Sequence, residues 1–157
     1  MYRLFIMLVL TLTIAVLSGL AMAQMSNEDQ IKVRQSAYTF IGWNMNRIRA
    51  QVIDQEVEFN PAQIQQAANA IAAVANSGMS ALYGPGTHEG SGWKPTRLKA
   101  EFFDELDQVG EIAGNFIQQA NALQEVAGGG DQAAIAGQFR QLADACGACH
   151  RNYRAPE

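Results

Sequence analysis

Residues 142–154 read Leu-Ala-Asp-Ala-Cys-Gly-Ala-Cys-His-Arg-Asn-Tyr-Arg, and the chain of 157 residues ends three residues later. Two residues separate Cys146 from Cys149, and His150 follows directly, which is the C-x-x-C-H pattern of covalent haem attachment. Residues three and four positions apart share one face of a helix, so both thiols can reach the vinyl groups on one porphyrin edge while His150 projects toward the iron. The stretch therefore predicts one haem c, bound by thioethers to Cys146 and Cys149, with His150 as the metal ligand.

Three other uses of the two cysteines are a thioredoxin-like dithiol, half of a zinc site and a structural disulfide. A redox dithiol needs a strand–helix context that the chain lacks, and zinc would need further thiol or imidazole ligands. The only other histidine is His88, in a glycine-rich loop. A disulfide is the ordinary fate of two cysteines in an exported protein, but the C-x-x-C-H spacing favours haem.

The motif lies in a segment with helical periodicity that begins at about Asp131. Apolar residues and both cysteines recur there at alternating steps of three and four, at Ile135, Phe139, Leu142, Cys146, Cys149 and Tyr153. Both thiols are therefore expected on the side of this helix that faces the protein core.

Two more helical segments are expected in the first half of the chain. The first begins near Ser26, where Ser26 and Asp29 have the spacing of a capping box. Its inward stripe is expected at Ile31, Arg34, Tyr38, Ile41, Met45, Ile48 and Val52. The second begins at Asn60-Pro61, a cap followed by proline, and ends at Ser77-Gly78. Its stripe is expected at Ile64, Ala67, Ile71 and Val74.

A third helical segment is expected from about Leu98 to Ala127, and the glycines of 128–130 stop it. Its apolar face is expected at Phe102, Leu106, Val109, Ala113, Phe116, Ala120 and Leu123. A glycine-rich loop from Gly84 to about Pro95 precedes it, and the other connections are short. With the segment that carries the motif, this predicts an all-α fold, an antiparallel four-helix bundle.

Residues 1–23 have the features of a secretory signal peptide: a positive charge at Arg3, an apolar run and the small-residue end Ala21-Met22-Ala23. A membrane anchor is the alternative, because the run approaches spanning length. The small residues favour cleavage before Gln24, which leaves residues 24–157 as one periplasmic domain with no membrane association. Ten basic residues then face fifteen acidic ones, and this acidic balance argues against a nucleic-acid partner.

The second face of the iron must be covered from earlier in the chain, because only seven residues follow His150. Tyr38 and Met45, both on the inward stripe of the first helix, are the candidates. Met45 is expected to pack in the core, as methionine usually does. Tyr38 is a poor ligand, because a phenol with an ordinary pKa near 10 stays protonated at neutral pH.

The chain resembles the cytochromes c′, the high-spin class of helical-bundle cytochromes, across the whole of its mature length. The likeness rests on residues 34–38 (Arg-Gln-Ser-Ala-Tyr), 42–45 (Gly-Trp-Asn-Met), 81–87 (Ala-Leu-Tyr-Gly-Pro-Gly-Thr) and 146–154. In that family the residue four after the arginine of Arg-Gln-x-x lies over the vacant face of the iron and does not bind it. The resemblance therefore implies a five-coordinate iron, with Tyr38 at the distal position.

The resemblance also implies roles for three polar residues near the haem. Arg34, on an otherwise apolar stripe, needs a partner for its buried charge, and both this cost and the resemblance point to a haem propionate for Arg34 and Gln35. The alternative for Arg34 is a side chain that extends to solvent. Arg154 is expected to border the proximal side of the haem; its alternative is a solvated cation favoured by the helix dipole.

The expected function is the binding of nitric oxide and carbon monoxide, to buffer nitric oxide or protect against it. A crowded, largely apolar distal pocket at Tyr38 favours neutral diatomic ligands. The alternative is a periplasmic electron carrier with a redox partner. An enzyme is not expected, because no acid–base pair is available on the first helix. The resemblance further implies a homodimer that pairs through the first two helices, and ligand entry past Tyr38 is expected to loosen it.

Overall fold

A computed structural model of the chain describes residues 25–156; the predicted signal peptide lies outside the described residues. The described residues form four long helices, α2 (Asn27–Val52), α3 (Pro61–Ala75), α4 (Leu106–Gly129) and α5 (Gln132–Tyr153), with two short 3-10 turns, η1 (Met79–Leu82) and η2 (Ala100–Phe103). No helix within residues 25–156 is long and apolar enough to cross a membrane.

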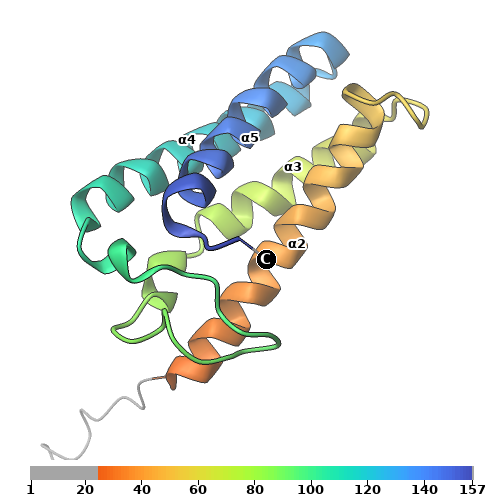
Figure 1. The fold of residues 1–157 in the computed structure, drawn as a ribbon. Helices are drawn as coiled ribbons and strands as arrows, with labels where there is room; N and C mark the ends of the chain where they lie inside the picture. The colour runs from red at the N-terminus through yellow and green to blue at the C-terminus, as the bar shows by residue number, and fades with distance from the viewer. Residues whose placement is uncertain (1–24, 157) are drawn as a thin grey trace, which may run out of the picture.

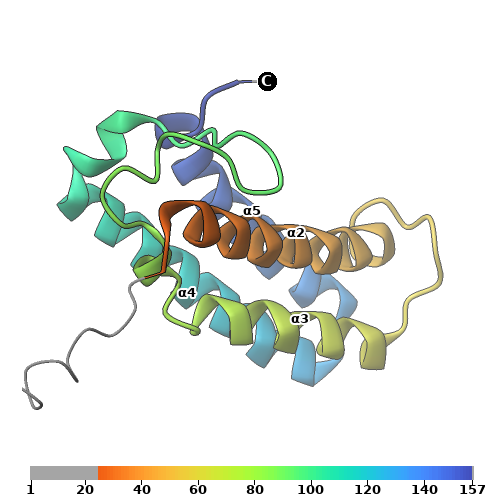
Figure 2. The same ribbon diagram turned by 90° about the horizontal axis from the view of Figure 1, so that it is seen from below.

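The four helices run in alternating directions along the chain (Figures 1 and 2). α3 packs against α2, α4 packs against α3, and α5 packs against α4 most extensively. α5 closes the bundle by contacting α2 across a smaller area. The prediction of an antiparallel four-helix bundle is confirmed.

Side-chain caps fix the start of three helices where the sequence predicts them. Ser26 Oγ accepts from the Asp29 amide at 3.1 Å and donates to the Asp29 carboxylate at 2.7 Å. Asn60 and Asp131 cap α3 and α5 in the same way. Gly130 ends α4 in the left-handed conformation, with φ of 68°. Each of the three side-chain caps satisfies an amide that the helix itself leaves free, and the Gly130 amide donates to the Ala127 carbonyl at the end of α4.

The core fills the half of the bundle away from the motif. Small residues on α3 let the neighbouring helices approach closely, and larger residues from all four helices interdigitate around them. The buried hydrophobic core contains Ile41, Ile48, Val52, Ile64, Ala67, Ala68, Ile71, Ala75, Ala120, Leu123, Ala127, Ile135, Ala136, Phe139 and Leu142.

The third helix is shorter than expected, because α4 begins at Leu106 and not near Leu98. The backbone just before it is bonded to the end of the chain: the Lys99 amide donates to the Tyr153 carbonyl at 3.0 Å, and Leu98 forms a bridge with Arg154. Those groups are therefore unavailable to a helix. Leu106 is 58% exposed and Ala113 is also exposed, so the expected apolar face is wrong at these two positions, whereas Phe102 is buried as expected. The first turns of α4 extend beyond the end of α3 (Figures 1 and 2).

Residues 83–97, which we call the strap, cross over the first half of α2. Asn27 and Gln30 bond the strap near its beginning, at the Pro85 carbonyl and the Gly84 amide. Gly92 allows the closest approach, because a Cβ there would lie 2.7 Å from the Lys32 amide nitrogen. The strap therefore joins α2 on one side to the residues around the end of α5 on the other.

Candidate haem-binding site

Cys146 and Cys149 lie one turn apart on α5, and both are free thiols of intermediate burial. Cys146 packs against the hydrophobic core, as its place on the apolar stripe predicts. Burial raises the pKa of Cys146 to about 11 and also raises the pKa of Cys149. Both are therefore neutral at physiological pH, unlike the low-pKa thiols of redox-active dithiols.

His150 follows at the exposed edge of the same helix, near its end. Partial burial lowers its pKa, and the positive charges of Arg154 and Arg97 lower it further. The neutral imidazole, which is the form that binds metals, is therefore favoured. Arg154 is the C-cap of α5, so it approaches His150 from just beyond the helix end.

Tyr38 faces this motif from α2. Burial of its hydroxyl is the main cause that raises its pKa, and negative charge on Cys149 or Cys146 would raise it further. The phenol is thus close enough to both thiols to sense them electrostatically. Nevertheless, Tyr38 as a whole is 41% exposed, so part of its ring faces open space.

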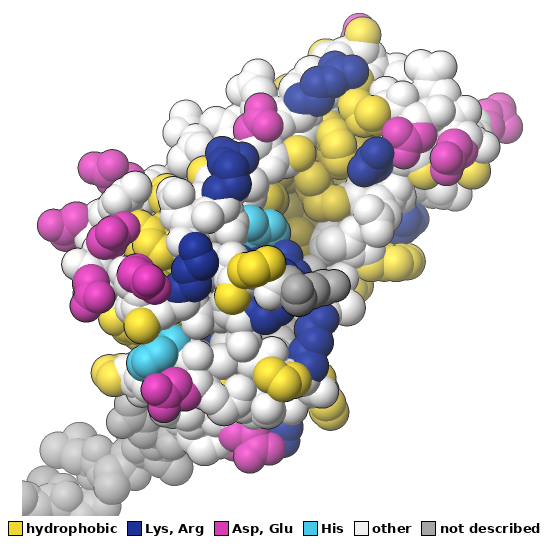
Figure 3. All heavy atoms as spheres, viewed as in Figure 1, with side chains coloured by type: hydrophobic (Ala, Val, Ile, Leu, Met, Phe, Trp, Pro, Cys, Tyr) yellow, Lys and Arg dark blue, Asp and Glu magenta, His cyan; other side chains and the backbone are white. Residues whose placement is uncertain are grey.

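The space between α2 and α5 has the chemistry of a haem pocket. Figure 3 shows a hollow between these two helices that is lined by hydrophobic side chains. Two free thiols and a neutral imidazole lie on α5, and a phenol that does not ionise readily lies on α2. This donor set fits a flat, apolar group attached along one edge and bound by one nitrogen.

Arg34 has partners within the chain, which corrects the reason given for a propionate. Its Nη1 donates to the Leu82 carbonyl at 3.0 Å and to Thr87 Oγ1 at 3.2 Å. Its Nη2 donates to the Thr87 carbonyl at 2.9 Å and to Thr96 Oγ1 at 3.2 Å. Arg34 is 6% exposed, so its side chain does not extend to solvent either. Arg34 therefore holds the strap, and its burial needs no haem propionate.

Gln35 also bonds to the strap. Its Oε1 accepts from the Trp93 amide at 2.8 Å and from the Lys94 amide at 3.3 Å, and its Nε2 donates to the Lys94 carbonyl at 2.8 Å. A haem-facing role for Gln35 is therefore not needed to explain its place beside Arg34.

The structure brings two residues to the site that sequence reasoning did not assign. Tyr83, the first residue of the strap, donates its hydroxyl to Tyr38 Oη at 3.0 Å. Arg97 lies close enough to His150 to lower its pKa. Tyr83 lies within residues 81–87, one of the stretches that carry the family resemblance, so the sequence held a signal for its role at the site. The sequence held no such signal for Arg97. Met45 is partly buried and packs against the core, as expected.

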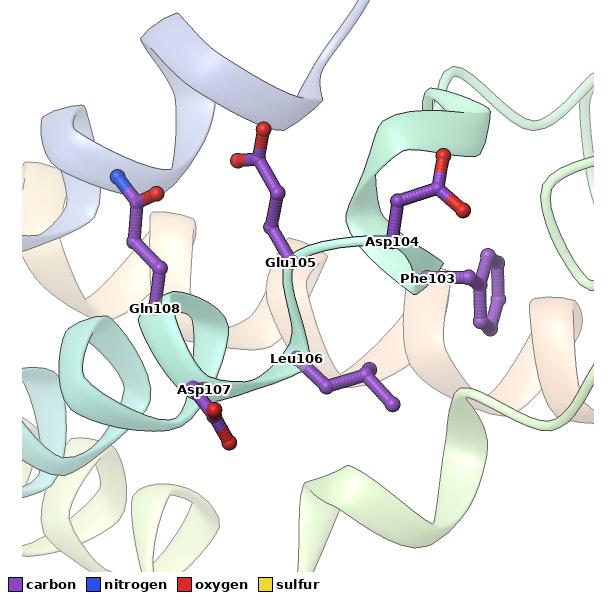
Figure 4. A pocket seen from close by; sticks show the side chains of 6 residues that line it. All are labelled: Phe103, Asp104, Glu105, Leu106, Asp107 and Gln108. Carbon is purple, nitrogen blue, oxygen red and sulfur yellow. The ribbon is translucent and has the colours of Figure 1, made fainter.

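Other polar groups do not gather into a second site. A zinc site would need a group of three or more His, Cys, Asp or Glu side chains. Residues 25–156 contain no such group that could hold a metal ion. His88 stays in the strap, with its ring against Phe103 at 5.3 Å between centroids. A shallow depression at the start of α4 is lined by Phe103, Asp104, Glu105, Leu106, Asp107 and Gln108. Their side chains point in different directions and do not converge on one point (Figure 4).

Comparisons with a family model, with known sequences and with solved structures all find cytochromes c′. A family model described as Cytochrome C′ matches residues 29–154. The cytochrome c′ of Allochromatium vinosum is 50% identical over 133 residues, which are 85% of this chain and 84% of that protein. The crystal structure of cytochrome c′ from Thermochromatium tepidum is 46% identical, with a TM-score of 0.79 over 85% of this chain and 100% of that chain. Another cytochrome c′ structure, described as having an unusual ligand-controlled dimer dissociation, is 49% identical, with a TM-score of 0.80 and the same two shares, 85% and 100%.

Proposed function

Because this chain belongs to the cytochrome c′ family and so binds haem c, we propose that it captures small neutral gases, nitric oxide and carbon monoxide, in the periplasm. The observation that carries this proposal is Tyr38, a neutral phenol that faces the cysteine motif across the bundle. Tyr38 lies beside the haem pocket, and its protonated phenol does not readily bind iron. The role that follows is to buffer nitric oxide or to protect against it.

The attachment is proposed at Cys146 and Cys149, with His150 as the axial ligand. A haem held in this way supplies an iron with one coordination position open to a diatomic gas. The lowered pKa of His150 and the position of all three residues near the C-terminal end of α5 support these roles. Arg154 and Arg97 place positive charge beside His150 on this side of the site.

Tyr38 is proposed to set which gases enter. The pocket beside it is apolar, so a polarised or charged ligand gains little there, whereas a neutral diatomic loses little solvation on entry. The Tyr38 hydroxyl accepts a hydrogen bond from Tyr83, so its own proton remains free to donate to another group. Around this hydroxyl the structure places Tyr83, Arg34 and the two thiols, which do not form the acid–base pair of a peroxidase.

The test is the carbon monoxide affinity of Tyr38→Ala in the ferrous protein. Removing the ring removes the group that must move aside, so the affinity should rise by at least tenfold. Asn46→Ala, an exposed polar position on the same helix, is the matched control and should change nothing. An unchanged affinity in Tyr38→Ala would mean that Tyr38 does not control entry.

A homodimer through α2 is proposed from an exposed apolar stripe on its outer face. Val33, Phe40 and Trp43 are 43%, 46% and 54% exposed, and exposed apolar patches of this kind mark protein interfaces. The Phe40 and Trp43 rings stack at 5.9 Å between centroids, and the Arg47 guanidinium lies 4.7 Å from the Trp43 ring centroid. The stripe is therefore pre-ordered.

Sedimentation tests the dimer and its link to the gas. Trp43→Glu should give monomers, whereas Leu106→Glu, a change at an exposed leucine on α4, should stay dimeric. The proposal also expects saturating carbon monoxide to lower the mass of the unmodified protein, since Tyr38 and the stripe share one helix. A dimer that persists with carbon monoxide would remove this link but not the interface.

The periplasmic location is proposed from the predicted signal peptide. Cell fractionation should find the haem-containing protein in the periplasmic fraction, and N-terminal sequencing should begin at Gln24. A mature protein that retains Arg3 would contradict export by cleavage.

A further inference from the structure

Tyr83 occupies a rigid position at the start of the strap. It follows η1 directly as the C-cap of that turn. One face of its ring stacks on Phe102 at 4.7 Å between centroids and 15° between planes. The Arg34 guanidinium lies over the ring at 4.5 Å from its centroid. Two neighbours therefore fix the ring, and neither depends on the hydroxyl.

The supports of Tyr83 are themselves buried and anchored. Phe102 is 5% exposed and meets the Tyr153 ring edge-on at 5.7 Å. Arg34 is bonded to four acceptors on the turn and strap. The row Tyr153, Phe102 and Tyr83 thus runs from the end of α5 to a single polar contact, the 3.0 Å hydrogen bond to Tyr38.

The same hydrogen bond joins the Tyr38 hydroxyl to a rigid frame. A tyrosine side chain turns about two single bonds, so a hydrogen bond at its far end restricts its orientation. A bond from a fixed donor therefore selects one orientation of the Tyr38 ring.

We propose that Tyr83 is a positioning residue that holds Tyr38 in its closed orientation and so sets the gas affinity of the site. Rotation of Tyr38 away from the pocket must break this hydrogen bond, and its strength is subtracted from the free energy of gas binding. This inference rests on the proposed function, because it assumes that Tyr38 moves when a gas binds.

The donor is available at every physiological pH. Burial strongly raises the pKa of Tyr83, and the neighbouring Tyr38 hydroxyl raises it further. The phenol therefore keeps the proton that it donates.

The experiment is a double-mutant cycle of Tyr83→Phe and Tyr38→Phe in the haem-loaded protein. Phenylalanine keeps the ring contacts with Arg34 and Phe102 and removes only the hydroxyl. Tyr83→Phe should raise the carbon monoxide affinity about three- to tenfold, the factor that one uncharged hydrogen bond is worth. The same change in a Tyr38→Phe background should have no further effect, because the acceptor is gone.

Urea unfolding of the same four proteins without gas provides a second readout that does not depend on ligand binding. The two changes should be non-additive in stability, since each removes the same bond. Tyr153→Phe is the matched control, because it also removes one tyrosine hydroxyl in the aromatic row but leaves the Tyr38 bond intact. It should leave the carbon monoxide affinity unchanged.

The outcomes separate the inference from the proposed function. If Tyr38→Ala changes the affinity but Tyr83→Phe does not, the positioning role is overturned and the gating role of Tyr38 stands. If Tyr38→Ala also has no effect, the proposed function fails and the inference fails with it. Additive stabilities in the cycle would overturn the inference even if the affinities shift.

Discussion

Replacement of Arg34 by methionine should destabilise the protein by releasing the strap from α2. Methionine fills a similar volume but donates nothing, so four acceptors lose the guanidinium as a donor. Thr87, which supplies two of them, is 0% exposed, and water cannot replace the lost bonds there. The Leu82 and Thr96 acceptors are only partly buried and can be rehydrated.

The cost follows from the buried acceptors alone. Each buried acceptor without a donor costs about 1 to 3 kcal/mol. The Thr87 hydroxyl loses its donor, at a cost of about 2 kcal/mol, and the Thr87 carbonyl loses one bond worth about 1 kcal/mol but keeps Thr96 Oγ1 as a donor at 3.4 Å. The predicted loss is therefore about 3 kcal/mol, which includes some relief from no longer burying a charge. For a domain of this size such a loss lowers the melting temperature by about 10 °C.

Urea denaturation of the haem-loaded protein measures the loss, and hydrogen exchange locates it. The Thr87 and Thr96 amides, which bond to Gly84 and Gly90 within the strap, should lose protection first. Arg49→Met is the matched control, because Arg49 makes an exposed ion pair with Asp54 at 2.9 Å. Such a pair contributes about 0.5 kcal/mol.

One result would refute this reasoning about Arg34. If Arg34→Met and Arg49→Met lose the same stability and the strap amides stay protected, the four hydrogen bonds do not hold the strap. A haem propionate would then be the better explanation for the buried charge of Arg34.

Three further predictions test other parts of the fold. Gly92→Ala should lower the free energy of unfolding in urea by about 2 kcal/mol, because the new Cβ would lie 2.7 Å from the Lys32 amide nitrogen and 2.9 Å from the Lys32 Cα. Gly137→Ala is the control and should not destabilise the protein, because nothing lies within 4 Å of a Cβ there. Asp131→Ala should cost about 1 kcal/mol by the same measurement, since its carboxylate accepts from the Ala134 amide at 2.8 Å; no loss would mean that the cap is not formed in solution. The hydrogen bond to Glu105 is the main cause that raises the pKa of Tyr153 to about 12 from an ordinary 10. The contribution of this bond to stability is therefore present below pH 10 and is lost as pH rises to 12. Tyr153→Phe should flatten this part of the curve of stability against pH, and an unchanged curve would count against the bond.

The sequence predicted the helices where local rules decide them. Ser26, Asn60, Asp131 and Gly130 all begin or end helices as expected, because capping and left-handed glycine depend on neighbours in the chain. The expected start of α4 near Leu98 was wrong for the opposite reason. Its backbone bonds to residues around Arg154, more than fifty positions away, which no periodicity reveals.

The candidate site divides in the same way. The spacing of Cys146, Cys149 and His150 is local, and the stripe of α2 placed Tyr38 on the side that meets them. The partners of Arg34 were not predictable, because they are backbone and hydroxyl groups of a loop that the sequence marks only as rich in glycine. A buried charge predicts that a partner exists, but it does not say which one.

The coordination of the iron in the gas-free ferrous protein tests the central claim most directly. Resonance Raman and absorption spectra of the purified haem-loaded protein should show a high-spin, five-coordinate iron with one imidazole ligand. A low-spin spectrum with sulfur or nitrogen on both sides, in both oxidation states, would contradict gas capture past Tyr38 and would favour an electron carrier.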